Sequence, residues 1–153
     1  MRFYFDACCV SRLTDDHRQE RIRKEAEAIE RLIGIATSDP NVWVSSAVLE
    51  AEIARNPNLE GREDAEALLT FVKQTIKLDD MIIDRARGLQ ALGFSAFDAM
   101  HLACAESGAV TIFLTTDDRL ARRATHHSDK LKFRVRNPVS FLEELENAGA
   151  THD

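Results

Sequence analysis

The stretch SAFDAMHLACAESGAVTIFLTTDD, residues 95–118, joins a helix, a strand and a pair of acids in one continuous segment. Ser95 is suited to open the helix and Gly108 to end it, because hydroxyl side chains cap helix N-termini and glycine favours C-termini. The helix between them is apolar on nearly all sides, which predicts a central position in the molecule. Val110–Leu114 then predicts a buried strand, and an acidic pair beginning at Asp117 follows it.

The rest of the chain repeats this alternation of short apolar strands and amphipathic helices. Extended segments are predicted at Arg2–Asp6, Val42–Ser45, Ile76–Leu78 and Lys132–Val135, and helices at His17–Thr37, from the second strand to about Ala54, and at Arg62–Gln74, Asp80–Leu92, Asp117–Ala124 and Val139–Asn147. The segment between the first strand and the first long helix is predicted to be a loop. Strands that alternate with helices indicate a parallel sheet covered on both faces. The pattern predicts an α/β fold with three layers, α/β/α, around a mainly parallel sheet, and a single domain over residues 1–153.

Composition narrows the function classes. The 153 residues carry 44% hydrophobic and 30% charged residues, as in ordinary globular proteins. No apolar run approaches the roughly 20 residues that span a bilayer, and no signal peptide follows Met1, so we expect a cytoplasmic protein without a membrane partner. Cys8, Cys9 and Cys104 have neither the spacing of a disulfide framework nor that of a zinc site, and are expected to be small apolar core residues.

The formal net charge of −6 argues against a protein that coats nucleic acid, because neutralising many phosphates requires excess positive charge. It does not exclude a nuclease, since a metal site built from carboxylates is itself acidic. Charge is also unevenly distributed. Between Arg119 and Arg136 seven lysines and arginines face the single acid Asp129, which makes this segment locally basic.

Acidic residues stand beside several of the predicted strands. They are Asp6 at the end of the first strand, Glu52 on the helix after the second, Asp98 in the first turn of the central helix, and Asp117 with Asp118 after Val110–Leu114. Sites of parallel sheets lie outside the carboxyl ends of the strands. Carboxylates gathered there need counter-charge to stay ionised, and magnesium prefers such oxygen ligands. No histidine or cysteine stands at a comparable place, which argues against zinc.

Each acid also has a plain structural explanation. Asp98 stands three residues after Ser95 in the pattern of a capping box, and Asp117 could cap its own helix. Glu52 could belong to a solvated helix face, whereas an acid that closes a buried strand, as Asp6 does, needs a partner. Their joint placement favours a common site. His101 lies one helical turn from Asp98, and packing or hydrogen bonding along the central helix is its expected role.

Four segments carry a resemblance to a known family. They are FYFDACC (3–9), VSSAVLEAEI (44–53), GFSAFDAMHLACA (93–105) and FLTTDDRL (113–120). In this order they are similar to the motifs of the PIN-domain nucleases, and the resemblance covers nearly the whole chain. The stretches at residues 11–32 and 52–58 resemble a prokaryotic subgroup, the VapC-like ribonuclease toxins.

The resemblance implies a metal site of Asp6, Glu52, Asp98 and Asp117 that binds Mg²⁺ or Mn²⁺ and hydrolyses RNA phosphodiester bonds. Glu50 and Asp118 remain alternatives to Glu52 and Asp117. Substrate-binding residues are expected at Arg119, Arg12 and Thr115.

In many relatives a hydroxyl residue follows the first acid. Here Ala7 stands in that place, so the hydrogen bond is expected either to be missing or to come from Thr115 or Ser45. The resemblance also implies a homodimer and an antitoxin protein that blocks the acidic cleft. A PIN nuclease of RNA processing or DNA metabolism, and a non-catalytic PIN-fold binding protein, are the alternatives.

Two other α/β classes fit less well. A haloacid-dehalogenase-like phosphatase requires a second acid two residues after the first, where this chain has Cys8. A response-regulator receiver has its acidic pair early in the chain, whereas here the pair comes late and Asp98 lies in a helix.

Overall fold

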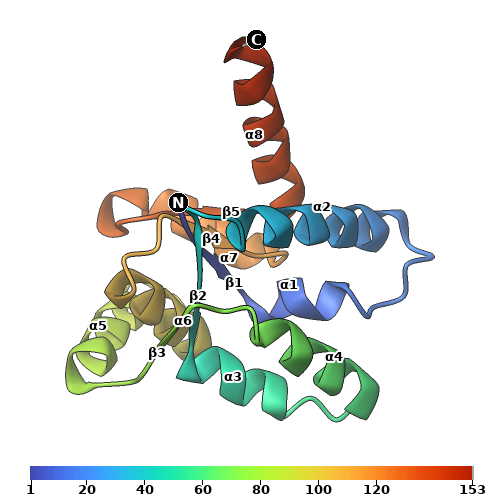
Figure 1. Ribbon diagram of the computed structural model, residues 1–153. Helices are drawn as coiled ribbons and strands as arrows, with labels where there is room; N and C mark the ends of the chain where they lie inside the picture. The colour runs from blue at the N-terminus through green and yellow to red at the C-terminus, as the bar shows by residue number, and fades with distance from the viewer. Residues whose placement is uncertain (153) are drawn as a thin grey trace.

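The computed structural model describes residues 1–152, with side chains described for residues 1–149. Short strands and helices alternate along the chain from a β1 strand to a long C-terminal helix (Figure 1). In chain order the elements are β1 Arg2–Phe5, α1 Ala7–Arg12, α2 Glu20–Ala36, β2 Val42–Ser46, α3 Ala47–Ala54, α4 Leu59–Leu69, β3 Gln74–Ile76, α5 Asp80–Ala91, α6 Ala96–Ser107, β4 Ile112–Leu114, α7 Asp118–His126, the 3-10 turn η1 Ser128–Lys130, β5 Arg134–Arg136 and α8 Pro138–His152.

The strands form one parallel sheet in the order β3-β2-β1-β4-β5. Phe3 of β1 stands opposite Trp43 of β2, and Phe5 stands opposite Leu114 of β4. The chain builds outward from β1 to β3 on one side, then returns and adds β4 and β5 on the other. The strand order therefore reverses between β1 and β4, and a crevice is expected at the carboxyl ends of these two strands.

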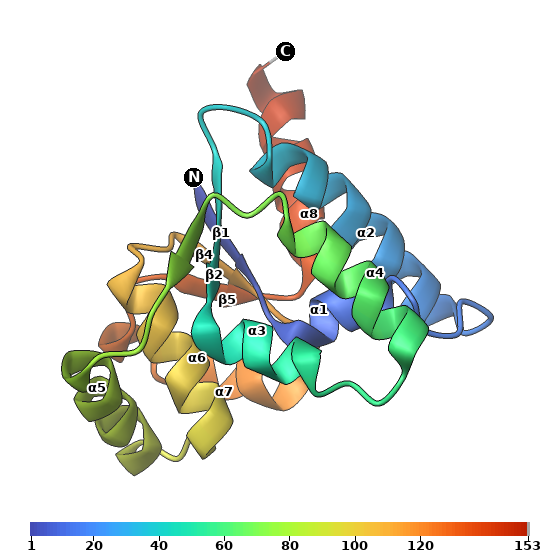
Figure 2. The same ribbon diagram turned by 60° about the horizontal axis from the view of Figure 1, so that its bottom comes forward.

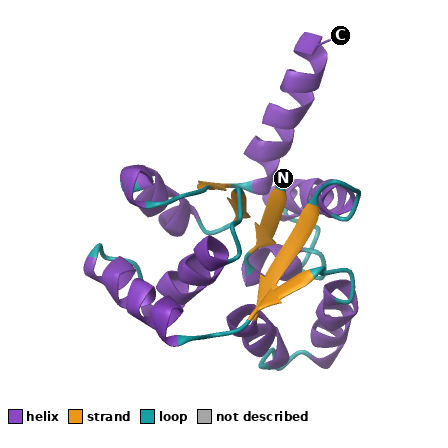
Figure 3. Ribbon diagram, turned by 60° about the vertical axis from the view of Figure 1, so that its left-hand side comes forward, coloured by secondary structure: helices purple, strands orange, loops and turns teal. Residues whose placement is uncertain are grey.

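Helices cover both faces of the sheet, which confirms the predicted three-layer α/β/α fold (Figures 2 and 3). Helices α1, α2 and α4 lie on one face with the start of α8, and α5, α6 and α7 lie on the other. Side chains of β1 pack against the helices on both faces of the sheet, because successive side chains of a strand point to opposite faces. The Phe3 ring packs on Phe141 of α8 with centroids 6.2 Å apart, and the Tyr4 ring faces His101 of α6 at 5.9 Å.

Several predicted boundaries are wrong by a few residues, as for strand β3, which lies at Gln74–Ile76 instead of Ile76–Leu78. Two differences change the type of structure that a segment adopts. Residues 7–12 form α1 instead of a loop, because Asp6 accepts a hydrogen bond from the N–H of Ala7 and Cys9 and Val10 are buried. Helix α4 ends at Leu69 rather than Gln74, since residues 74–76 pair with β2 as a strand. Among the described residues, none of the helices combines the length and the apolar character that crossing a membrane would require.

Candidate functional site

Asp6 follows β1 directly and lies beside the carboxyl end of β4. The pairing of these strands places it beside Thr115, and its own N–H donates to the carbonyl oxygen of Leu114 at 2.9 Å. Its side chain is only 8% exposed. Oδ1 accepts the N–H of Ala7 at 2.8 Å, and Oδ2 accepts the hydroxyl of Thr115 at 3.0 Å. Asp6 is therefore a fixed carboxylate that closes a buried strand.

Thr115 joins two of the candidate acids. Its Oγ1 donates to Asp6 and accepts the N–H of Asp117 at 3.1 Å. Thr115 thus supplies the hydrogen bond that was expected from either Thr115 or Ser45, whereas Ser45 Oγ is buried and without a hydrogen-bond partner in the described part of the chain. Thr115 is 1% exposed, so its hydroxyl acts on Asp6 and not on the outer surface, where a direct substrate contact would be made.

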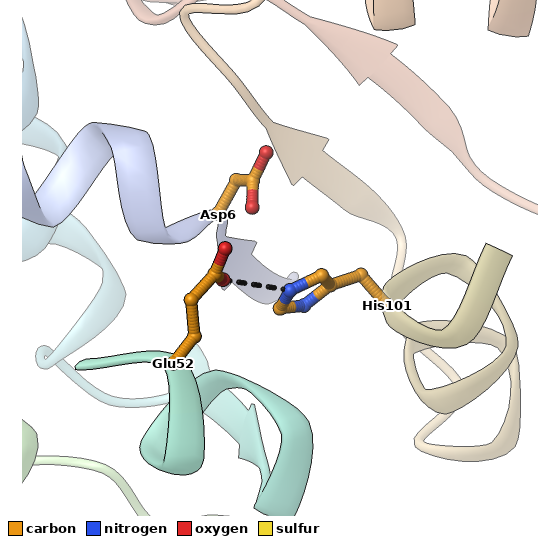
Figure 4. Close-up of side chains that lie close together, drawn as sticks. All are labelled: Asp6, Glu52 and His101. Carbon is orange, nitrogen blue, oxygen red and sulfur yellow. Dashed lines mark hydrogen bonds and ion pairs between the residues drawn. The ribbon is translucent and has the colours of Figure 1, made fainter. Parts of the chain in front are cut away.

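Glu52 approaches Asp6 from α3, and His101 approaches it from α6 (Figure 4). His101 Nε2 and Glu52 Oε2 are 2.9 Å apart, and one ligand atom from each of Asp6, Glu52 and His101 lies within 4.8 Å of the others. A histidine was not expected at this place. His101 bonds across to another element instead of along its own helix, and it adds nitrogen to a cluster expected to hold only oxygen ligands.

His101 also joins a buried chain of polar groups. Its Nδ1 is 2.7 Å from the hydroxyl of Tyr4, and that hydroxyl is 2.7 Å from Ser46 Oγ, which accepts the N–H of Leu49. Burial raises the pKa of Tyr4 well above its usual value, so this hydroxyl keeps its proton. A neutral His101 satisfies the whole chain when Tyr4 donates to Nδ1 and Nε2–H donates to Glu52.

Asp98 and Asp117 lie near enough to the cluster for their charges to act within it, but their carboxylates are not among the ligand atoms that lie within 4.8 Å of one another. Asp98 is half-buried in the first turn of α6, where its N–H bonds Ser95 Oγ at 3.2 Å, as expected for a capping residue. Burial raises the pKa of the Asp98 carboxyl, and the negative charges of Asp6 and Asp117 raise it further. Asp117 is exposed and caps α7, its Oδ1 accepting the N–H groups of Arg119 and Leu120. Capping of the helix occupies one carboxylate oxygen of Asp117. The negative charge of Asp117 still acts on the cluster, through Asp98.

The two alternative acids point elsewhere. Asp118 forms two hydrogen bonds with Arg21 of α2, at 2.9 and 2.8 Å. Glu50 accepts the hydroxyl of Thr75 in β3 at 3.2 Å. Geometry therefore favours Glu52 over Glu50 and Asp117 over Asp118 as members of the cluster.

The two arginines expected to bind substrate differ in their surroundings. Arg12 lies 3.0 Å from Glu25 and 3.0 Å from Asp15, so its guanidinium serves an ion-pair network between α1 and α2. Arg119 is exposed and takes part in none of the ion pairs found in residues 1–149. Of the two arginines, only Arg119 therefore has a guanidinium group that forms no ion pair within residues 1–149.

The electrostatics of the cluster call for a cation. Burial raises the pKa of Asp6, with the charge of His101 and the Thr115 hydrogen bond opposing the shift and Glu52 adding to it. Burial lowers the pKa of His101, but Glu52, Asp6 and Asp98 outweigh it and the pKa lies above its ordinary value. Both shifts show excess negative charge in a poorly solvated place. The carboxylate oxygens suit a divalent cation such as Mg²⁺ or Mn²⁺, while both ring nitrogens of His101 are taken up by hydrogen bonds to Tyr4 and Glu52.

The chain belongs to the PIN domain family, whose model matches residues 3–125, a range that contains all four acids. Solved structures with VapC toxins share its fold. They include VapBC2 from Rickettsia felis bound to a DNA fragment from their promoter (TM-score 0.58, 8% identity, covering 90% of this chain and 98% of that one), VapBC-1 from nontypeable Haemophilus influenzae (0.58, 15%, 90% and 98%) and the sarcin-ricin loop cleaving toxin VapC20 from Mycobacterium tuberculosis (0.58, 17%, 78% and 93%). A search of curated protein sequences gives no significant match. At identities this low, the likeness to the solved structures establishes the fold alone.

Proposed function

We propose that the protein is a divalent-metal-dependent ribonuclease and the toxin of a toxin–antitoxin pair. The observation that supports the proposal is the cluster of Asp6, Glu52 and His101 beside the strand-order reversal, where the charges of Asp6 and Asp117 also act on Asp98. The raised pKa values of Asp6 and Asp98 support a site that gains a cation when it works.

Asp6, Glu52, Asp98 and Asp117 would hold Mg²⁺ or Mn²⁺. Such an ion, when bound, lowers the pKa of a coordinated water and stabilises charge on phosphoryl oxygens. The protein's own task is to keep the ligands in place. Thr115 fixes the orientation of Asp6 through its hydroxyl, and His101 fixes that of Glu52. Arg119, exposed beside the cap of α7, is placed to bind a phosphate of the substrate.

The toxin assignment draws on two of the solved structures with this fold, which are VapBC structures. An antitoxin would suit the cluster chemically if it brought an arginine or lysine to the carboxylates, because that side chain supplies the absent positive charge. We extend the proposal to a homodimer in the cytoplasm, as the family resemblance implies.

The test compares the wild-type chain with Asp6→Asn on structured and single-stranded RNAs in EDTA, Mg²⁺ or Mn²⁺. We expect cleavage only with metal, and a loss of at least about a hundredfold in the variant, because one central charge is removed. Glu50→Gln is the matched control, since it removes a nearby charge outside the cluster. Equal cleavage by wild type and Asp6→Asn would refute the proposed site, and cleavage of DNA alone would refute the RNA assignment.

A wild-type protein that cleaves nothing requires a second readout. Thermal unfolding with and without Mn²⁺ shows whether the cluster binds a cation at all. A shift in melting temperature that Asp6→Asn abolishes would show that the cluster binds metal and that the RNAs tested do not include the substrate. The absence of any shift would favour a binding protein without catalysis.

A further inference from the structure

A hollow of about 300 Å³ on the surface of α7 is lined by Arg119, Arg122, Arg123 and His126. These positions follow the spacing i, i+3, i+4 and i+7, so they share one face of the helix. All four residues are exposed. The hollow is therefore lined by groups that are positively charged or can become so, on a protein whose overall charge is negative.

The arginines of this hollow form no close ion pair with an acid in the described part of the chain, although the charge of Arg122 acts on Asp118 from a greater distance. Other cations of the same basic segment are paired, since Arg134 and Arg136 both contact Glu144 at 2.8 Å. Among the ion pairs of residues 1–149, none includes an arginine of the hollow. The nearest acid of α7, Asp118, is held by Arg21. Three guanidinium groups that face one hollow repel one another unless an anion lies between them.

Packing holds one of these arginines against the turn between α5 and α6. Gly93, in the turn between α5 and α6, has a φ of +104°, and a Cβ atom built on it would overlap Nη1 of Arg123. The guanidinium therefore lies directly on the backbone that leads into α6, two residues before Ser95. The ring of Phe94 faces His127 at 5.9 Å and strengthens the same junction. Asp117 caps the start of α7, and the hollow lies on the same helix, beginning two residues further on at Arg119.

We propose that this hollow binds the phosphodiester backbone of RNA next to the bond that is cut. The inference rests on the proposed function, of which it names a substrate-binding surface. Four acids in a cleft repel a polyanion, and an overall charge of −6 adds to the repulsion. Unpaired arginines on the helix that begins in this cleft offset that repulsion. A contact between these guanidinium groups and phosphate oxygens contributes affinity without sequence preference, because the phosphates are the same at every position of the chain.

The experiment measures binding of a labelled single-stranded RNA in EDTA, where metal-dependent cleavage does not occur. The test variant is Arg122→Gln/Arg123→Gln. The control is Arg23→Gln/Arg87→Gln, which makes the same charge change on α2 and α5 at exposed positions. We expect about tenfold weaker binding in the test variant at moderate salt. The slope of log K against log salt should fall by about 0.7 for each phosphate that the variant no longer neutralises.

Circular dichroism serves to check that both double variants fold. We expect them to do so, because all four substituted positions are exposed. Equal weakening in test and control variants, or no RNA binding by the wild type, would overturn the inference. Preferential capture of polyglutamate over RNA through the same arginines would also overturn it, because the hollow would then fit an acidic protein. If the nuclease assay fails while the test variant alone loses RNA binding, this inference stands and the proposed catalysis does not.

Discussion

At the scale of single residues, Glu52 is the member of the cluster whose position depends most on other side chains. The Glu52 side chain is 40% exposed, and it is held to the buried part of the protein by its contact with His101. His101 is in turn oriented by Tyr4, which is fully buried. Such outer partners commonly decide how tightly a ligand set binds metal, because they fix the tautomer and the ring orientation of the histidine.

Tyr4→Phe tests this dependence. The change leaves Nδ1 of His101 and Oγ of Ser46 short of a partner in the core, at a cost of about 1–3 kcal/mol in the free energy of unfolding. We also expect Mn²⁺ affinity to fall by about tenfold or more, because the imidazole loses its orienting bond. Urea denaturation and calorimetric titration with Mn²⁺ measure the two effects.

Ser45→Ala is the matched control, since it removes a buried hydroxyl of β2 that bonds nothing within the described chain. Its stability should change little and its Mn²⁺ affinity not at all. Wild-type Mn²⁺ affinity in Tyr4→Phe would show that His101 holds Glu52 without help from the hydroxyl.

Asp6, Asp98 and Asp117 could be read from the sequence because each stands next to a recognisable strand end or helix start, whereas Glu52 lies near the end of α3 and was chosen by its resemblance to the family motif. The partners of His101 could not, because Tyr4 and Glu52 lie 97 and 49 residues away along the chain. Only the packing of α6 on the sheet brings these side chains together. The ion pair between Arg12 and Glu25 could not be predicted either, because the sequence around an arginine does not indicate which acid it contacts.

At the scale of secondary-structure elements, the turn between α5 and α6 sets the position of both α6 and Arg123. Gly93→Ala should destabilise the protein by about 1–2 kcal/mol, because a φ of +104° strains any residue with a Cβ. The new methyl group would also displace the Arg123 guanidinium. Thermal and urea unfolding give the size of the loss.

Gly88→Ala is the comparison for this change. Gly88 lies within α5, and a Cβ there meets no atom within 4 Å. An alanine in a helix interior is favoured over glycine by about 0.5–1 kcal/mol, so this variant should gain stability. If both substitutions moved stability in the same direction, positive φ would not be the controlling feature of Gly93.

Helices α1 and α2 are joined through a buried carboxylate. Glu25 is 1% exposed and accepts hydrogen bonds from Arg12, Arg21 and Asn137. Glu25→Ala should cost about 3 kcal/mol of unfolding free energy, because both arginines lose a common partner in a poorly solvated place. Glu27→Ala, an exposed position of the same helix, should change stability by less than about 0.5 kcal/mol in the same urea titration. Similar values for the two would deny Glu25 this joining role.

The short elements were the hardest to predict from the sequence: α1 was missed, and β3 was predicted two residues too late, at Ile76–Leu78. Helix α1 has six residues, too few for an amphipathic period to repeat, and its start depends on the carboxylate of Asp6. Strand β3 has three residues and exists because β2 offers it a free edge. The long helices and the central strands carry enough apolar residues to be recognised without tertiary information.

At the scale of the whole molecule, alternation of strands and helices predicts the layered fold but not the order of the strands. That order follows from long-range pairing, such as Phe5 with Leu114, and it determines where the strand ends meet. Because the reversal lies between β1 and β4, acids from both halves of the chain share one crevice. The molecule therefore concentrates negative charge at one edge, and its stability should depend on pH and on metal together.

The pKa values of Asp6, Asp98 and His101 are all raised in the folded protein. A raised pKa means that the folded state binds protons more tightly than the unfolded chain. The stabilisation is therefore complete below the unfolded pKa and is lost as pH rises through the folded value. For His101 the loss begins above about pH 6.5, and for the two aspartates above about pH 4.

In EDTA, stability should thus decrease between pH 6 and pH 8, by no more than about 1.4 kcal/mol per pH unit for each group that titrates. Saturating Mn²⁺ should act in the opposite sense, because the ligands bind metal in their deprotonated forms. The difference in melting temperature between Mn²⁺ and EDTA is expected to widen as pH rises from 6 to 8. His101→Gln should flatten the EDTA curve, whereas Glu27→Gln should leave it unchanged. An EDTA curve that climbs with pH over this range would mean that the cluster is already neutralised within the protein, and it would remove the electrostatic reason for a metal at this edge of the sheet.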